Sequence, residues 1–288
     1  KPEYFFRPFT VSLGAINFRK KSSLSIKAEN TIKHKVKDFV ERYIEIEEIC
    51  DVSNVSELEK FPIKDAGDVI NAANKLINQW GVGKDGIFSV IDLLEEHSVK
   101  VLEIDADMKF EGLCAYLDKN GAVIVVNKNF PSERKRFTAL HELGHLILAF
   151  DGSISDKDQE LYCNLFANEM LISKDRLKFL LGDYRDVISY QELKAIQMQY
   201  GISCDAIMYK AKQCNIISPN RYKSYCIQKN KSEGFKSMVE SSHFKNETTS
   251  RFSRLVYKAL SSELITESKA ASLLNMDIQT VHEALALV

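Results

Sequence analysis

The stretch that decides the interpretation of this sequence is Phe137-Thr138-Ala139-Leu140-His141-Glu142-Leu143-Gly144-His145. It follows Pro131, a residue suited to the first turn of a helix, and it carries the pattern His-Glu-x-x-His within a helix that we expect over 132–150. Residues four apart lie on one face of a helix, so both imidazoles can bind one metal ion. Two histidines packed in a helical core are the alternative. The metal site is favoured because Glu142 lies near apolar residues, where a carboxylate is costly unless it has a partner or a role.

A third ligand has to come from elsewhere, because a catalytic zinc takes three protein ligands and keeps a fourth position open. The helix expected over 156–173 offers Glu160 as that ligand and Asn164, one turn later, as an amide that orients an imidazole. Glu169 is the rival ligand on the same helix, and a solvated acid near a helix start is the alternative interpretation of Glu160.

Glu142 stands next to a proposed ligand, which suits it to accept a proton from the attacking water. Zinc lowers the pKa of bound water, so the residues together predict hydrolysis of an amide bond. The donor that stabilises the oxyanion is left open among four side chains, Tyr116, Tyr162, Tyr184 and His97.

The composition is that of a folded protein with balanced charge. Of the 288 residues, 45% are hydrophobic and 27% charged, and 39 Lys plus Arg stand against 40 Asp plus Glu. This balance gives no overall attraction to nucleic acid or to an anionic membrane. Two basic stretches, 19–37 and 221–236, leave nucleic-acid binding by a local patch as a third hypothesis. The apolar run beside the motif is far too short for a membrane helix, and we expect no membrane partner.

The expected compartment follows from the cysteines and from the first residues. Six cysteines are scattered without paired spacing, which favours reduced thiols over disulfides: Cys50, Cys114, Cys163, Cys204, Cys214 and Cys226. The start of the sequence lacks the charged, apolar and small-residue order of a secretory signal. Both features predict a cytoplasmic protein.

Hydrophobic periodicity predicts a mainly helical α+β fold with a small β-sheet. Apolar residues recur at spacings of three and four over 31–50, 65–80 and 87–97, which predicts three amphipathic helices. Strands are expected over 99–104, 113–117 and 122–126, and the Asn120-Gly121 turn joins the last two as a hairpin. Several more helical periods follow Asp151-Gly152.

The residues around the motif resemble the ImmA/IrrE family of bacterial and phage metallopeptidases. The similar features are the helix and strand over 86–104, Ile124-Val125-Val126-Asn127, Arg136-Phe137-Thr138, and Glu160-Leu161-Tyr162-Cys163-Asn164-Leu165-Phe166-Ala167-Asn168-Glu169-Met170-Leu171. The last run is similar to the family's Glu-x-x-Ala-Asn-x-Phe-Ala-x-x-Leu-Leu. It departs from the family at Cys163, where alanine is usual, and at Ile172-Ser173, where the family has Met-Pro. By this resemblance Glu160 is the third ligand, beside His141 and His145.

The resemblance also implies a division of the chain. We expect an N-terminal linker and helix over 1–64, a zincin-like metallopeptidase core over 65–185, a helix-turn-helix-like segment over 186–218 and a helical region over 219–288. A packed helix pair is an equal alternative for the third part. Family members with an N-terminal segment like Tyr4-Phe5-Phe6-Arg7-Pro8 commonly carry a Cro-type DNA-binding domain just upstream, so the resemblance implies DNA contact through a domain ahead of this chain.

The family's best understood role is to cut a helix-turn-helix repressor, which releases the genes it silences in mobile-element transfer or the DNA-damage response. By resemblance we expect a zinc-dependent endopeptidase whose protein substrate is such a repressor. The runner-up is a metal-containing transcription regulator or scaffold that senses or binds without cleaving. Glu142 favours cleavage, and a purely structural zinc would need a fourth protein ligand, for which Cys163 is the nearest cysteine.

Overall fold

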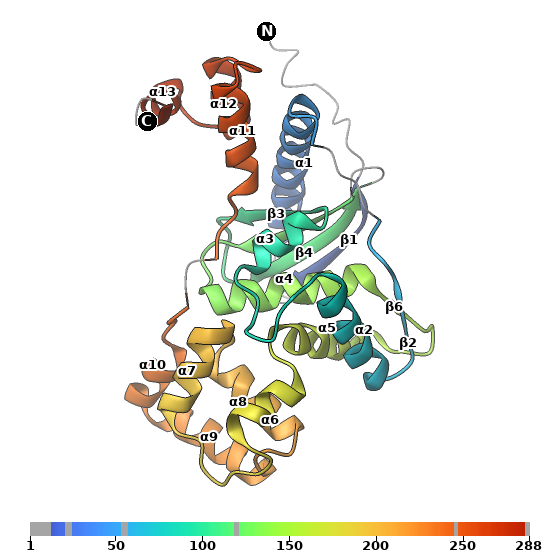
Figure 1. Cartoon of the computed structure of the whole chain (residues 1–288), viewed down its shortest axis with the longest axis vertical. Helices are drawn as coiled ribbons and strands as arrows, with labels where there is room; N and C mark the ends of the chain where they lie inside the picture. The colour runs from blue at the N-terminus through green and yellow to red at the C-terminus, as the bar shows by residue number, and fades with distance from the viewer. Residues whose placement is uncertain (1–12, 21–24, 53–56, 118–120, 245–246, 286–288) are drawn as a thin grey trace. The chain divides into compact units, whose positions relative to one another are not determined.

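The computed structural model describes residues 13–20, 25–52, 57–117, 121–244 and 247–285. Thirteen helices and six short strands in these residues confirm the mainly helical α+β fold (Figure 1). The segment Tyr4–Pro8 and the turn residues Asp118–Asn120 lie outside the described residues. None of the described helices is both long and apolar enough to cross a membrane.

The chain forms two compact units that alternate along the sequence. The first unit takes Lys1–Leu58, Ile91–Val126 and Thr248–Val288, and the second takes Glu59–Val90 and Asn127–Glu247. The four consecutive parts expected from the sequence remain a prediction. The residues proposed for the metal centre all belong to the second unit.

The first unit contains a four-stranded sheet in the order β1-β4-β5-β3. Strand β1 (Leu13–Lys20) pairs antiparallel with β4 (Phe110–Leu117), and β4 pairs antiparallel with β5 (Gly121–Asn127). Strand β3 (Val99–Ile104) has the bounds expected from its alternating pattern. The hairpin of β4 and β5 is therefore confirmed. Gly121 has a φ of +82° and lies against the Ser98 carbonyl, a place where no Cβ would fit.

Helix α1 (Ile26–Ile49) begins at Ser25, whose side chain accepts a hydrogen bond from the Ala28 amide. Its apolar stripe packs against the apolar side chains of β4 and β5 in one core. Helix α3 (Val90–Glu96) is shorter than the helix expected over 87–97. Three C-terminal helices, α11 (Arg251–Ser261), α12 (Glu267–Leu274) and α13 (Ile278–Leu285), form a second core with the end of α1.

The second unit is built around α4 (Ser132–Ile147), which packs on α5 (Asp156–Leu171), while α5 also packs on α2 (Ala66–Gln79). The helix expected over 132–150 is too long, because its last three residues form strand β6 (Leu148–Phe150). They pair in parallel with β2 (Phe61–Ile63), for which the hydrophobic pattern had predicted no strand. The backbone groups of 148–150 thus bond to a strand 87 residues earlier in the chain rather than to α4.

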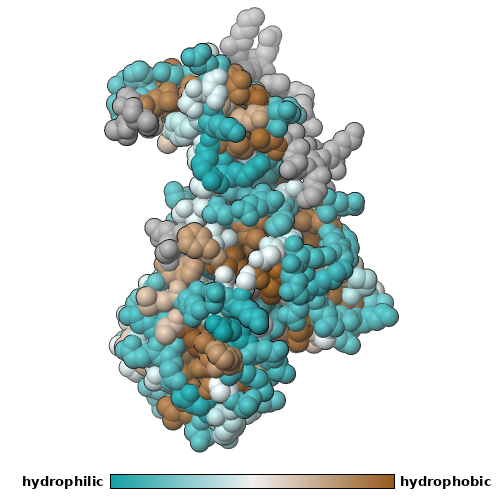
Figure 2. Space-filling model, viewed as in Figure 1, coloured by the Kyte–Doolittle hydropathy of each residue, from teal (hydrophilic) through white to brown (hydrophobic). Residues whose placement is uncertain are grey.

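Five further helices complete the second unit: α6 (Lys174–Leu181), α7 (Tyr190–Tyr200), α8 (Cys204–Gln213), α9 (Pro219–Lys231) and α10 (Glu233–Glu240). Gly201 makes the expected turn between α7 and α8 in the left-handed region, with a φ of +58°. Gln213 is the only exposed residue of α8. This burial favours a packed helix pair over a helix presented to a DNA groove. Figure 2 shows apolar surface interspersed with hydrophilic surface on the face viewed.

Candidate metal centre

His141, His145 and Glu160 converge in the second unit, the two histidines from α4 and the carboxylate from α5. The Nε2 atoms of His141 and His145 are 3.1 Å apart. Glu160 places one oxygen 3.3 Å from the Nε2 of His141 and the other 3.1 Å from the Nε2 of His145. His141 is fully buried and the Glu160 side chain is half exposed, so solvent reaches the cluster from the Glu160 side.

Close contact between α4 and α5 brings the carboxylate to the histidines. Gly144 lies between the two histidines in sequence and faces Cys163, one turn after Glu160. A Cβ on Gly144 would lie 3.3 Å from the Cys163 Sγ and 3.4 Å from its Cα. Glycine therefore lets the two helix backbones approach closely. Because His141 and His145 are four residues apart, they lie on the face of α4 where Glu160 of α5 meets them.

Asn164 fixes the tautomer of His141. Its side-chain oxygen lies 3.0 Å from the His141 Nδ1. Because an amide oxygen only accepts, the imidazole proton lies on Nδ1, and the lone pair of Nε2 faces the Glu160 and His145 donor atoms. Metal-binding histidines are oriented in this way by a hydrogen bond to their other nitrogen.

The donor set fits a zinc ion. Zinc binds imidazole nitrogen and carboxylate oxygen at about 2.0–2.2 Å, and tetrahedral geometry then separates neighbouring ligand atoms by about 3.3 Å. Here the two Nε2 atoms are 3.1 Å apart, one Glu160 oxygen lies 3.3 Å from the His141 Nε2, and the other lies 3.1 Å from the His145 Nε2. Three electron-pair donors this close together favour a shared cation.

Within the described residues the donor cluster contains three side chains, and Cys163 is not among them. Its sulfur lies against Gly144 in the helix contact. A zinc ion held by three protein ligands keeps a coordination position open, as catalytic sites do. Glu142 follows His141 directly on α4 and is fully buried, so it is a carboxylate beside the cluster that does not itself join the donor set.

Glu169, the rival ligand, has another partner. Its carboxylate lies 2.7 Å from the ammonium of Lys210 on α8, and both side chains are 3% exposed. The other Glu169 oxygen accepts the Lys174 amide at the start of α6. Lys210 also donates to the carbonyls of Asn168 and Ile172 at the end of α5. Glu169 therefore ties α5, α6 and α8 together. It stands nine residues after Glu160, the member of the donor cluster nearest to it in sequence.

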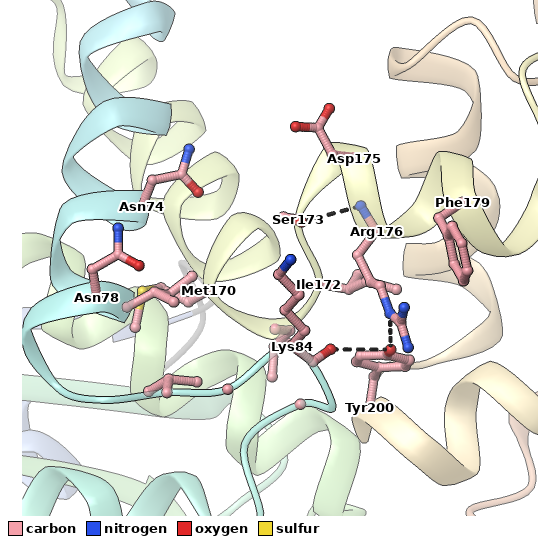
Figure 3. Close-up of a pocket in the computed structure, with 15 residues that line it drawn as sticks. Asn74, Asn78, Lys84, Met170, Ile172, Ser173, Asp175, Arg176, Phe179 and Tyr200 are labelled. Carbon is pink, nitrogen blue, oxygen red and sulfur yellow. Dashed lines mark hydrogen bonds between the residues drawn. The ribbon is translucent and has the colours of Figure 1, made fainter.

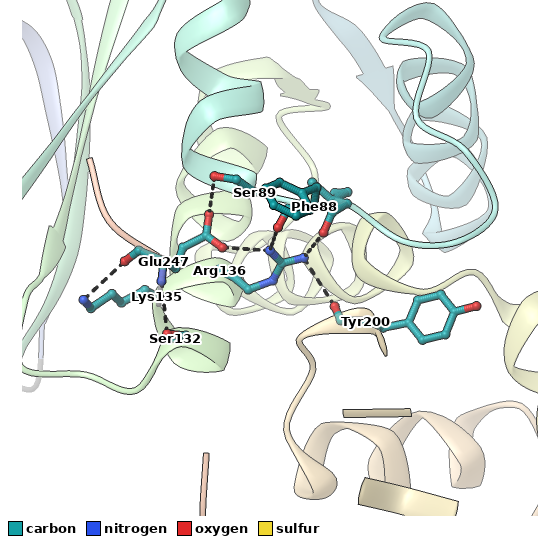
Figure 4. A network of polar contacts seen from close by, with 8 residues as sticks. Phe88, Ser89, Ser132, Lys135, Arg136, Tyr200 and Glu247 are labelled. Carbon is teal, nitrogen blue, oxygen red and sulfur yellow. Dashed lines mark hydrogen bonds and ion pairs between the residues drawn. The ribbon is translucent and has the colours of Figure 1, made fainter. Parts of the chain in front are cut away.

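Arg136 is a buried residue on α4 for which no separate role was predicted (Figure 4). Its guanidinium donates to Glu247 at 2.8 Å, to the Ile87 carbonyl at 2.8 Å and to the Tyr200 carbonyl at 3.3 Å. It also lies 4.3 Å from the centre of the Phe244 ring. Burial lowers the pKa of Arg136, an effect that Glu247 opposes. This network fixes α4 five residues before His141. The only sequence signal was a charged residue in the Arg-Phe-Thr run before the motif.

The four side chains proposed for the oxyanion divide between the two units. Tyr162 and Tyr184 belong to the second, whereas His97 and Tyr116 belong to the first. Tyr162 stacks on Phe150 with ring centres 6.3 Å apart, and Tyr184 is 61% exposed. The choice among them remains a prediction.

Comparison with known family models gives a match that covers the candidate metal centre. Residues 94–212 match the family model of the IrrE N-terminal-like domain. The match includes α4 and α5 with all three donor residues, and it confirms the resemblance to the ImmA/IrrE family. Over these residues the protein is similar to a metallopeptidase domain of that family. The comparison with curated proteins returned no match.

Proposed function

We propose that this protein is a zinc-dependent endopeptidase that cleaves a helix-turn-helix transcriptional repressor and so relieves repression in mobile-element transfer or a stress response. The observation that carries the proposal is the convergence of His141, His145 and Glu160 within 4.8 Å of one another in a domain of a metallopeptidase family. The repressor substrate rests on the role best understood in that family. A cytoplasmic site of action follows from such a substrate.

The roles proposed for the individual residues follow their positions. His141, His145 and Glu160 would hold the zinc, and Asn164 would keep the His141 proton on Nδ1. Zinc, when bound, would supply a Lewis acid that makes water nucleophilic near neutral pH. Glu142 would accept the proton of the attacking water at its carboxylate and return it to the leaving amine. Its burial beside the cluster supports this role, because a desolvated carboxylate is a stronger base than one in water.

The alternative is a metal-containing regulator or scaffold that binds without cleaving. A purely structural zinc would be closed by four protein ligands. The three-residue cluster in the described part of the chain supports the peptidase over this alternative.

The test is co-expression of the protein with helix-turn-helix repressors encoded near its gene, scored for repressor fragments. We expect fragments with the natural protein, and we expect none with Glu142→Gln, since loss of a general base lowers rates about a hundred- to ten-thousandfold. Glu142→Gln should still bind about one zinc per chain, whereas His141→Ala should lose both zinc and cleavage. The opposite result would be that Glu142→Gln relieves repression to the same extent as the natural protein while His141→Ala does not. That result would favour the scaffold hypothesis over the peptidase hypothesis.

A further inference from the structure

A cavity in the second unit lies toward the C-terminal end of α5, beyond Glu160. It has a volume of about 470 Å³ and is lined by residues of α2, the loop 82–86, the end of α5, the start of α6 and Tyr200 of α7 (Figure 3). This volume is within the range of about 300–1,000 Å³ that small-molecule sites occupy. The lining residue Met170 is ten residues after Glu160, or about 15 Å along the helix, so the cavity is separate from the metal cluster.

Two cations line the cavity. Lys84 is exposed, and its ammonium forms no ion pair with any residue that the structure describes. Arg176 donates through Nε to the Tyr200 hydroxyl at 2.6 Å, and its nearest carboxylate, on the 93% exposed Asp85, is 3.7 Å away. The lining residue Asp175 and the neighbouring Asp85 carry opposing charges. Lys84 and Arg176 nevertheless place two cations on the cavity lining, which suits an anionic group.

Neutral hydrogen-bonding groups face the cations across the cavity. Asn74 and Asn78 stand one turn apart on α2, and both are exposed. Figure 3 shows Lys84 projecting between these two asparagines on one side and Arg176 with Tyr200 on the other. Each amide offers a donor and an acceptor, the combination that a heterocyclic ring edge requires.

Apolar side chains supply the rest of the lining. Ile77, Val82, Met170 and Ile172 contribute aliphatic surface, and Phe179 adds an aromatic ring that is 77% exposed. The Arg176 guanidinium lies 5.0 Å from the centre of that ring. A flat apolar ring would bury this surface, which otherwise faces water.

The loop that carries Lys84 is held in place. The Tyr200 hydroxyl donates to the Lys84 carbonyl at 3.3 Å. Gly86 has a φ of +94°, and a Cβ there would lie 3.0 Å from the Tyr200 ring. Tyr200 thus positions both cations of the cavity, Lys84 through its backbone and Arg176 through its side chain. A lining held in place before binding loses less entropy when a ligand arrives.

We infer that this cavity is a binding site for a nucleoside monophosphate. The phosphate would lie between Lys84 and Arg176, the polar edge of the base would bond to Asn74 and Asn78, and the base would cover the apolar wall. The site is independent of the proposed peptidase activity, since it shares no residue with the metal cluster.

The experiment is titration calorimetry of the full chain with AMP, GMP, CMP and UMP, and separately with inorganic phosphate and adenosine. We expect at least one nucleotide to bind with a Kd below about 1 mM, and phosphate and adenosine to bind at least about tenfold more weakly. Lys84→Gln should weaken the bound nucleotide by about tenfold or more, because it removes a charge-assisted hydrogen bond. Asn78→Leu should lower the affinity for that nucleotide without changing the affinity for inorganic phosphate.

Lys174→Gln is the matched control, because it removes the same charge from an exposed lysine of α6 that does not line the cavity. It should change nucleotide affinity less than about twofold. Lys84 is exposed, so Lys84→Gln should fold, which a thermal melt checks. Absence of binding by all four nucleotides would overturn the inference. The inference would also be overturned if inorganic phosphate bound as tightly as the nucleotides. An equal loss of nucleotide affinity in Lys84→Gln and in Lys174→Gln would overturn it as well.

Discussion

Gly144 on α4 faces Cys163 on α5 so closely that a Cβ on the glycine would lie 3.3 Å from the cysteine sulfur. Glu160 stands one turn before Cys163, and His141 and His145 flank Gly144 in sequence. The separation of the two helices at this contact therefore sets the separation between the histidines and the carboxylate.

Gly144→Ala should weaken zinc binding by about tenfold or more, although alanine favours a helix over glycine by about 1 kcal/mol. The added methyl group requires Cys163 to move away by a few tenths of an ångström, and Glu160 moves with its helix. Chelator competition measures the affinity. Gly152→Ala is the control, since a Cβ there meets no atom within 4 Å. Adding Cys163→Ala to Gly144→Ala should restore part of the zinc affinity, because it removes the side chain that the new methyl group meets. If the double variant bound zinc no better than Gly144→Ala, the separation of the two helices would not control zinc affinity.

Asn164→Ala should lower zinc affinity by about ten- to a hundredfold, because the His141 ring loses the acceptor that fixes its proton on Nδ1. Asn164→Asp keeps an acceptor oxygen and should retain most of the affinity. Zinc content after dialysis against a weak chelator provides the measurement. Equal losses in the two variants would show that Asn164 acts through packing rather than through this hydrogen bond.

Arg136→Met should destabilise the fold by about 3–5 kcal/mol, because it leaves the carboxylate of Glu247 buried without its 2.8 Å partner. The double variant Arg136→Met with Glu247→Met should be more stable than Arg136→Met alone, since it removes the uncompensated charge. Urea unfolding measures both. The half-exposed pair Arg185–Glu192 is the control, and Arg185→Met should cost only about 0–1 kcal/mol. A double variant less stable than Arg136→Met would contradict this explanation.

Glu95 in the first unit should make stability depend on pH. Burial raises the pKa of its carboxyl from 4.5 to about 7, although a hydrogen bond from the Tyr43 hydroxyl opposes the shift. The folded state therefore binds more protons than the unfolded state between these values, and its stability falls as pH rises from about 4.5 to about 7. Glu95→Gln should raise stability at pH 8, by an amount on the order of 2–3 kcal/mol, and change it little at pH 4.5.

Thermal melts from pH 4.5 to pH 8 test the Glu95 prediction. Glu96→Gln is the matched control, because Glu96 is the exposed neighbour on the same helix. Its pH profile should follow that of the natural protein. A Glu95→Gln profile parallel to the natural one would show that another group titrates in this range.

Local sequence patterns predicted several of the helices and the spacing of the candidate ligands. The His-Glu-x-x-His pattern and the pair Glu160–Asn164 are each set by one helical turn, a local geometry that the chain carries before it folds. The strands β3, β4 and β5 were also predictable, because their apolar runs and the Asn-Gly turn are local signals.

Tertiary packing established which remote groups meet. It paired Leu148–Phe150 with Phe61–Ile63, and so ended α4 three residues before the helical pattern did. It placed Glu169 in an ion pair with Lys210 and placed Glu160 beside the two histidines, although both glutamates lie on the same helix. It also surrounded Arg136 with carbonyls from two distant segments. Periodicity indicates which face of a helix or strand is buried. The partner of a buried charge depends instead on how separate elements pack, and no local sequence pattern encodes that packing.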